Sequence, residues 1–249
     1  MPNRSQHALF AEQTYNMVGK GNKNKRVEKI NKNIEKTGFV VDKKHSNRDI
    51  VTYVNHDTNE VHVSHRGTDT TGKRTGSDLV RDFNIAIGKT ADDDEFKRRT
   101  KKTKKALKEH EDKKATGSGH SLGSKSMVTT MATDKYVRDR MDEVHGFNGG
   151  ATIFGEKEMQ KLGKKGKKQM EEKMIHHRTS NDAVSASMLV NPPLGKVKTY
   201  KEKKDPDEEQ TRRTAETLGS DLTKGDAAAV LNSHGLHHFY RKKDYHDDI

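Results

Sequence analysis

The stretch Gly119-His120-Ser121-Leu122-Gly123 places one serine midway between two glycines. A G-x-S-x-G pattern can hold a nucleophilic serine on a tight turn between a strand and a helix. Glycine suits the flanking positions because a side chain there would keep the neighbouring backbone away. The backbone N–H after the serine, here that of Leu122, then faces a developing oxyanion. With 20 glycines in the chain the pattern also arises by chance, and Ser121 could instead be a helix N-cap.

A serine hydroxyl is a weak nucleophile, so the pattern calls for a base and for an acceptor that orients the base. Asp182 follows a strand-like segment and His234 lies near the C-terminus, which gives the order Ser, Asp, His along the chain. We therefore predict Ser121 as nucleophile, His234 as general base and Asp182 as the orienting carboxylate. His237 and His238 compete with His234, and Asp182 could instead cap a turn.

Histidines offer a second chemistry, metal binding, at His176, His177, His234, His237 and His238. They lack the fixed two-histidine spacing plus carboxylate of a metalloprotease helix. The chain also has no cysteine, which excludes a thiolate nucleophile, a disulfide framework and a zinc-thiolate site. We expect no metal and no cofactor.

The segments around the serine alternate between strand-like and helix-like patterns, which favours an α/β layer architecture with a mostly parallel central sheet flanked by helices. A polar linker is predicted at 19–26, and Asp57-Thr58-Asn59 is a turn signal between two strands of a hairpin. The predicted strands are 38–41, 50–54, 61–64, 115–119, 144–148 and one starting at 174; the predicted helices are 5–18, 77–87, 92–113 and 121–138, with an exposed helix or loop at 156–173.

The length of 249 residues fits one domain, 1–249. Only 29% of the residues are hydrophobic and 35% are charged, so the core must be concentrated in a few short segments. We expect charged surface insertions near 92–113, 156–173 and 201–226.

The formal net charge of +12 favours polyanionic partners: nucleic acid, anionic membrane surfaces or acidic polymers. Lysine tracts lie at 97–105, 157–168 and 201–204, and no nucleic-acid motif accompanies them. Tryptophan is absent and aromatic residues make up 5%, which argues against a broad stacking platform for single-stranded nucleic acid. We expect docking on an anionic membrane surface, with nucleic acid as a secondary alternative; the oligomeric state is left open.

The start of the sequence lacks a long apolar segment of the secretory type, and no run approaches 18 apolar residues. The sequence therefore favours a cytoplasmic or particle-associated protein.

Several of these segments together resemble the class 3 (fungal-type) lipase family of α/β-hydrolases, over roughly residues 50–240. The GHSLG stretch is preceded by a strand ending in Arg66-Gly67-Thr68, which is similar to the family's strand ending in Arg-Gly-Thr or Arg-Gly-Ser. Residues 146–151 resemble a segment of the family's bacterial and viral branch. Residues 181–184 resemble its segment with the triad aspartate, and residues 234–239 resemble its histidine-containing ending.

The resemblance implies an α/β-hydrolase fold and the hydrolysis of acyl esters of lipids through an acyl-enzyme, without a cofactor. It implies an oxyanion hole made by Thr68 and the backbone of Leu122. The sequence departs from the family at Ser124, where a small glycine is usual, in lacking a recognisable apolar lid helix, and in its basicity. The basicity suits a lipase-like protein of a large DNA virus, carried in the particle. The alternative is a non-catalytic basic scaffold or virion-associated protein on the same fold, which binds membrane or nucleic acid by charge.

Overall fold

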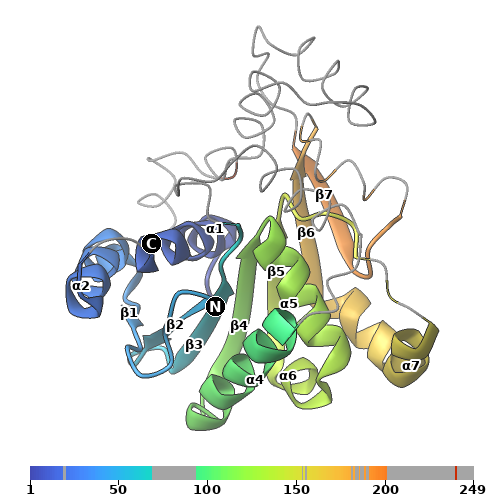
Figure 1. Ribbon diagram of the computed structural model, residues 1–249, viewed down its shortest axis with the longest axis horizontal. Coiled ribbons are helices and arrows are strands. Elements are labelled where there is room, and N and C mark those ends of the chain that lie inside the picture. The colour runs from blue at the N-terminus through green and yellow to red at the C-terminus, as the bar shows by residue number, and fades with distance from the viewer. Residues whose placement is uncertain are drawn as a thin grey trace, which may run out of the picture.

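The structure is a computed structural model (Figure 1). It describes residues 1–18, 21–68, 94–152, 154, 156–180, 182, 185, 188, 191–200 and 239.

Seven strands of this described part form one sheet, and their order across the sheet is their order along the chain. β1 pairs antiparallel with β2, and β2 with β3, whereas the strands from β3 to β7 run parallel to one another. The sheet is therefore mostly parallel, as predicted. Its strands are β1 (Val40–Val41), β2 (Ile50–Asn55), β3 (Glu60–His65), β4 (Lys114–His120), β5 (Met141–Phe147), β6 (Met174–Thr179) and β7 (Lys196–Tyr200).

The predicted hairpin between β2 and β3 is present. The side-chain oxygen of Asn55 accepts the backbone N–H groups of Asp57 and Thr58, at 3.0 Å each. Asn59 has a φ of 55°, in the left-handed region that asparagine tolerates better than most residues. These local features turn the chain so that β3 runs toward Thr68.

Four helices cover one face of the sheet: α4 (Asp94–Glu109), α5 (Leu122–Thr133), α6 (Lys135–Arg140) and α7 (Glu156–Lys173). They precede or connect the parallel strands β4, β5 and β6. Parallel connections share one hand, so strands that are added in one direction place their helices on the same face. The resulting core joins these helices to Val61, Val63, Ala115 and Val144 of the strands.

The N-terminal segment covers the other face with α1 (Arg4–Gln13), the 3₁₀ turns η1 (Thr14–Met17) and η2 (Glu35–Thr37), and α2 (Lys23–Ile34). Its apolar side chains form a second core with Val51 and Tyr53 of β2. The hydroxyl of Tyr53 donates to the carbonyl of Phe10 at 2.9 Å. The helix predicted at 5–18 is thus confirmed as α1 followed by η1.

The polar linker predicted at 19–26 is wrong, because α2 begins within it. Asn22 is the N-cap, and its side chain accepts the backbone N–H of Lys25 at 3.0 Å. Val27, Ile30 and Ile34 then supply a narrow buried stripe at helical spacing. Three apolar residues among many lysines and asparagines suffice here because the stripe packs against α1, η1 and β1 within the second core.

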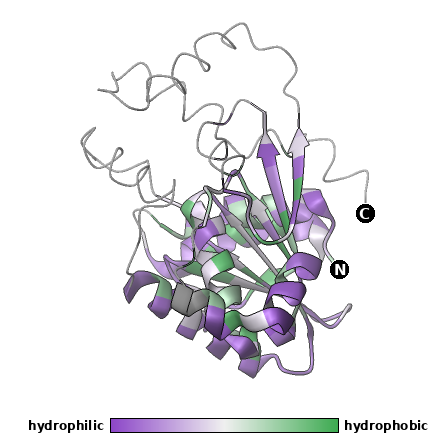
Figure 2. Cartoon of the chain, turned by 90° about the vertical axis from the view of Figure 1, so that its right-hand side faces the viewer, coloured by the Kyte–Doolittle hydropathy of each residue, from purple (hydrophilic) through white to green (hydrophobic). Residues whose placement is uncertain are grey.

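Residues 92–113 and 156–173, expected as charged surface insertions, contain α4 and α7. Each of these helices buries a few residues: Phe96, Ala106 and Leu107 of α4, and Leu162 and Met170 of α7. Figure 2 shows hydrophilic residues along the outer surfaces of the helices and apolar residues where helices meet the sheet.

The helix predicted at 77–87, the charged segment at 201–226 and His234 lie outside the described residues. Phe239 is described: it is buried against Phe147 at the end of β5 and against Tyr200. Among the helices of the described residues, none is long and apolar enough to cross a membrane.

Candidate active site

Ser121 stands between β4 and α5 in a backbone conformation that serine rarely adopts, with φ 55° and ψ −126°. Positive φ costs free energy for a residue with a Cβ and persists only where the surroundings impose it. The Ser121 side chain makes no capping hydrogen bond to α5. The ordinary helix-cap interpretation of this serine therefore does not describe the structure.

The two glycines of the pattern are required by close backbone contacts. A Cβ on Gly119 would lie within 3.0 Å of the backbone of Gly123 and Ser124. A Cβ on Gly123 would lie within 3.0 Å of the backbone of His65 and Arg66 at the end of β3. The turn after β4 is thus pressed against both the start of α5 and the end of β3.

Backbone hydrogen bonds hold the serine at the carboxyl edge of the sheet. The N–H of Ser121 donates to the carbonyl of Phe147 at 2.9 Å, and its carbonyl accepts the N–H of Ser124 at 3.0 Å. The N–H of Leu122 belongs to the first turn of α5, at the positive end of the helix dipole. An anion is favoured at this point.

The segment that ends β3 passes directly beside the serine. A Cβ on Gly67 would lie 2.6 Å from the carbonyl oxygen of His120 and 3.3 Å from the Cβ of Ser121. Thr68, the next residue, is half-buried. On the other side of Gly67, Arg66 is held by the backbone: its N–H donates to the carbonyl of Asp49 at 3.0 Å. The structure thus places Thr68 next to a residue that contacts the serine.

Asp182 lies three residues beyond β6, and 1% of its surface is exposed. Its Oδ2 accepts the backbone N–H of Ser185 at 2.8 Å, so the turn-capping role considered from the sequence is present. Burial lowers the pKa of the Arg178 guanidinium, and the Asp182 carboxylate counteracts part of that shift.

The ends of β5 and β6 are joined through Asn148. This residue is fully buried with a φ of 42°, and its N–H donates to the carbonyl of His177 at 2.8 Å. Its side-chain oxygen accepts the N–H of Thr179 at 3.0 Å. Ser121 and Asp182 therefore both lie at the carboxyl ends of parallel strands, the edge where α/β sheets bind their ligands.

Two sets of contacts around the site were not predicted from the sequence. Tyr15 of η1 shares a hydrogen bond of 2.8 Å with Nδ1 of His120, the residue before the serine, so the N-terminal segment supports the turn. Ser124 replaces the glycine usual in the resembled family, and the glycines at 146 and 149 make room for it: a Cβ on either would lie within 3.0 Å of its Oγ.

Of the five histidines considered for a metal, the structure describes His176 and His177, and both are buried in β6. Burial lowers the pKa of His176 to about 4 and that of His177 to about 2. His176 donates from Nε2 to the carbonyl of Leu194 at 3.0 Å. His177 is hydrogen-bonded on both nitrogens, to His145 and to Tyr200. Both are neutral side chains held within the core.

The structure combines a mostly parallel sheet, crossover helices and a strained serine between a strand and a helix. The fold is that of an α/β-hydrolase. No protein-family model matches the sequence, and no curated protein matches it.

Solved structures of similar fold include Lip2 lipase from Yarrowia lipolytica, with 17% identity over 72% of this chain and 70% of that chain and a TM-score of 0.43. A mutant form of MDLA from Penicillium cyclopium has 16% identity over 80% and 78% of the two chains and a TM-score of 0.41. A protein described as a fungal lipase has 14% identity over the same shares and a TM-score of 0.42. The sheet order and the Ser121 turn, rather than these low similarities, carry the fold assignment.

Proposed function

We propose that the protein is a serine esterase or lipase that hydrolyses acyl esters of lipids through an acyl-enzyme on Ser121. The observation that carries the proposal is the backbone of Ser121 at φ 55°, held by the required glycines on either side. Strain of this kind is retained only where the surroundings impose it, and it supports a functional role for a serine at the edge of the sheet where ligands bind.

In the proposed reaction, Oγ of Ser121 attacks the ester carbonyl carbon while His234 takes the hydroxyl proton. The N–H of Leu122 and Thr68 stabilise the resulting oxyanion. The carbon–oxygen bond of the ester then breaks, and the alcohol leaves with the proton from His234. Water attacks the acyl group on Ser121 in the second half of the reaction and releases the carboxylic acid.

Asp182 is the proposed partner that orients His234. Ser121 and Asp182 follow strands two positions apart in the sheet, a separation of about 10 Å between strand axes. One imidazole with a hydrogen bond on each side spans about 8 Å, so it can bridge side chains that extend from these two strand ends. The capping bond to Ser185 uses Oδ2 of Asp182 and fixes the orientation of the carboxylate.

Hydrolysis of acyl esters of increasing chain length by wild type and variants tests the proposal. Ser121→Ala should remain folded and lose at least about 10³-fold in kcat, since residual catalysis would come from binding and the oxyanion hole alone. Ser180→Ala, which changes an exposed serine near the same edge, is the matched control and should retain full activity. Turnover that survives Ser121→Ala would contradict the proposal.

The proposed base, His234, and the proposed orienting carboxylate, Asp182, are tested in the same assay. His234→Ala should abolish turnover, whereas His237→Ala and His238→Ala should retain most of it. Asp182→Asn keeps an oxygen to accept the N–H of Ser185, so a loss of activity in a folded Asp182→Asn variant reports the charge rather than the turn. If His237→Ala is the inactive variant instead, the base is His237 and the assignment of His234 is wrong.

We further propose that the surplus of basic residues docks the enzyme on an anionic lipid surface, where its ester substrates are presented. Lysine-rich α4 and α7 support this, because both lie on the same face of the sheet and present their polar sides outward (Figure 2). Each basic residue close to an anionic membrane contributes about 1 kcal/mol, so a few suffice.

A further inference from the structure

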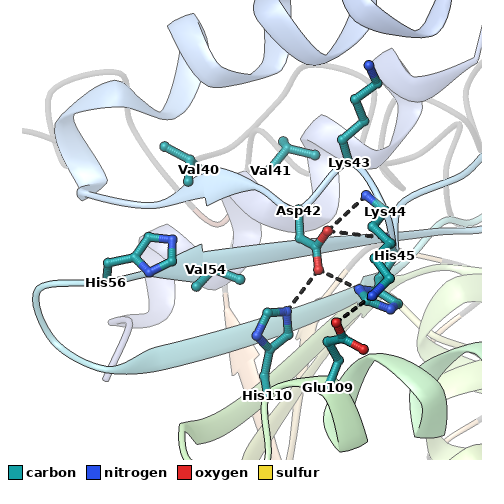
Figure 3. A pocket seen from close by; sticks show the side chains of 10 residues that line it. All are labelled: Val40, Val41, Asp42, Lys43, Lys44, His45, Val54, His56, Glu109 and His110. Carbon is teal, nitrogen blue, oxygen red and sulfur yellow. Dashed lines mark hydrogen bonds and ion pairs between the residues drawn. The ribbon is translucent and has the colours of Figure 1, made fainter.

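A second cluster of reactive side chains lies away from Ser121, where the end of α4 meets the loop after β1 (Figure 3). Oδ2 of Asp42 lies 2.6 Å from Nδ1 of His45 and 2.8 Å from Nε2 of His110. One carboxylate oxygen thus lies between two imidazole nitrogens. The sequence analysis singled out none of these residues.

The surrounding backbone holds this cluster in place. Oδ1 of Asp42 accepts the backbone N–H groups of Lys44, at 2.8 Å, and of His45, at 3.3 Å, which leaves Oδ2 directed at the imidazoles. The carbonyl of His45 accepts the hydroxyl of Thr52 in β2 at 3.2 Å. His110 directly follows α4. Hydrogen bonds within the loop and to β2 hold Asp42 and His45, and the end of α4 holds His110, as preorganised ligand sites require.

The cluster lines an open cavity of about 420 Å³, whose wall also includes Val40, Val54 and His56 (Figure 3). His45 is 6% exposed, and its Nε2 is buried with no hydrogen-bond partner among the described residues. The nitrogen that faces Asp42 is Nδ1, so Nδ1 is the ligand atom that His45 offers beside the carboxylate.

We propose that Asp42, His45 and His110 bind one divalent transition-metal ion, with Zn²⁺ as the best fit. The two imidazole rings cross at 80° with centroids 5.9 Å apart, so a single ion can lie close to the planes of both. Zinc takes nitrogen ligands at about 2.0–2.1 Å and carboxylate oxygens at about 2.0–2.2 Å, usually in tetrahedral geometry. An ion would replace the two N–H protons shared with Asp42 and move the ligand atoms apart by about half an ångström or slightly more. The cavity supplies the fourth position, for water.

A comparison within the molecule supports the choice of this cluster. His7, Glu143 and His145 also bring potential ligand atoms together. The rings of His7 and His145, however, stack at 3.8 Å with only 7° between their planes. A metal must lie near the plane of each ligating imidazole, and two parallel planes at this separation cannot share one ion. Of the two clusters found among the described residues, only that around Asp42 has suitable ring geometry.

The surroundings select the class of metal. Lys43 and Lys44 lie beside the cluster, and Lys44 is paired with Glu109 (Figure 3). Mg²⁺ and Ca²⁺ bind through several oxygen ligands, whereas this cluster offers a single carboxylate. Two imidazoles and one carboxylate instead suit Zn²⁺, Ni²⁺ or Cu²⁺.

The position of the cluster indicates a structural ion. α4 ends near the amino end of β4, at Lys114, whereas Ser121 follows the carboxyl end of that strand. The seven residues of β4 separate the two sites by about 20 Å at 3.3 Å per residue. A bound ion would fasten α4 to the segment between β1 and β2, and it would stabilise the fold without taking part in ester hydrolysis.

Thermal unfolding of tag-free, chelator-treated protein tests this inference. Equimolar Zn²⁺ should raise Tm by several degrees, and Mg²⁺ at the same concentration should leave it unchanged. His110→Ala, which alters a partly buried residue, should lose the zinc response. His56→Ala, a change in an exposed histidine of the same cavity, should keep it. An equal response in His110→Ala, or an equal response to Mg²⁺, would overturn the proposal.

Co²⁺ provides a second readout that does not depend on stability. One equivalent should give the visible absorption of a four- or five-coordinate cobalt site in wild type and in His56→Ala. The bands should be absent in Asp42→Asn, which can still accept the N–H groups of Lys44 and His45 through its side-chain oxygen. Identical spectra in wild type and Asp42→Asn would contradict the assignment. Neither readout involves ester hydrolysis, so its result is independent of the proposed function.

Discussion

At the scale of single residues, the site depends on positions that carry no side chain. Gly67, Gly119 and Gly123 allow the backbone of three segments to meet around Ser121. These backbone contacts place the side chain of Ser121, because they hold the serine in a backbone conformation that it would otherwise avoid.

Gly123→Ala should be severely destabilising or prevent folding. Its Cβ would overlap the backbone of His65 and Arg66, which cannot move without separating β3 from α5. Gly117→Ala in the same region is the control, because its nearest contacts are 3.2 Å or more away and include the flexible end of Met127. Urea unfolding should show a loss of several kcal/mol for Gly123→Ala and about 1 kcal/mol for Gly117→Ala. Equal losses would mean that the turn is not constrained as described.

The pattern around Ser121 could be predicted from the sequence because glycine, serine and glycine act within five consecutive residues. Asp182 could be placed after a strand for the same local reason. Two other features could not be predicted from the sequence: the contact of Tyr15 with His120, and the cluster of Asp42, His45 and His110. They join residues far apart in the chain, and no fixed spacing marks them.

At the scale of elements, the strands β3 to β6 differ in polarity between their two faces. The face toward α4 to α7 is largely apolar. The face toward α1 buries His62, which is hydrogen-bonded to a threonine and a serine, and the hydrogen-bonded pair His145 and His177. The alternation of polar and apolar residues along these strands indicates that the polar face is exposed to solvent, but α1 covers that face. The parallel order was predictable from alternating elements; the burial of the polar face was not, because it depends on the docking of a distant helix.

Acid should destabilise the protein below about pH 6.5. Burial lowers the pKa values of His62 and His65 well below 6.5, and those of His176 and His177 to about 4 and about 2. These groups are neutral in the folded protein and take up protons on unfolding once the pH falls below their unfolded value of about 6.5. The stability they contribute is complete above that pH and decreases as the pH falls toward the folded values.

Each such histidine lowers the free energy of unfolding by about 1.4 kcal/mol per pH unit in that window. Urea unfolding at pH 7.5, 6.0 and 5.0 should therefore show a steep decrease. His176→Gln should reduce the slope, and the exposed His56→Gln should not. The carboxylate of Asp49, whose pKa is lowered to about 2, acts only below about pH 4, so the two effects are separable. Constant stability between pH 7.5 and 5.0 would contradict the burial of neutral histidines.

At the scale of the whole molecule, the two sides of the sheet have distinct roles. The N-terminal segment lies on one side of the sheet and supports the turn at Ser121. The helices that join the parallel strands cover the other side. The +12 charge is not needed for ester hydrolysis, and we attribute it to docking on an anionic surface.

Binding to anionic vesicles should therefore weaken steeply with added salt, because the attraction is screened over about 10 Å at 0.1 M. Turnover of a small soluble ester should change little over the same range. Lys101→Glu with Lys105→Glu on α4 should reduce co-sedimentation with anionic vesicles. Lys29→Glu with Lys32→Glu, which makes the same charge change on exposed positions of α2, should have a smaller effect. Equal binding to neutral and anionic vesicles would exclude the docking proposal.

The central claim is that Ser121 is an activated nucleophile, and covalent labelling tests it most directly. A fluorophosphonate probe reacts with activated serines, and digestion followed by mass spectrometry locates the label. The account predicts one label per native chain, on Ser121, with no label on the unfolded protein or on Ser121→Ala, and slower labelling of Asp182→Asn. No labelling of the native protein, or a label that persists in Ser121→Ala, would contradict it.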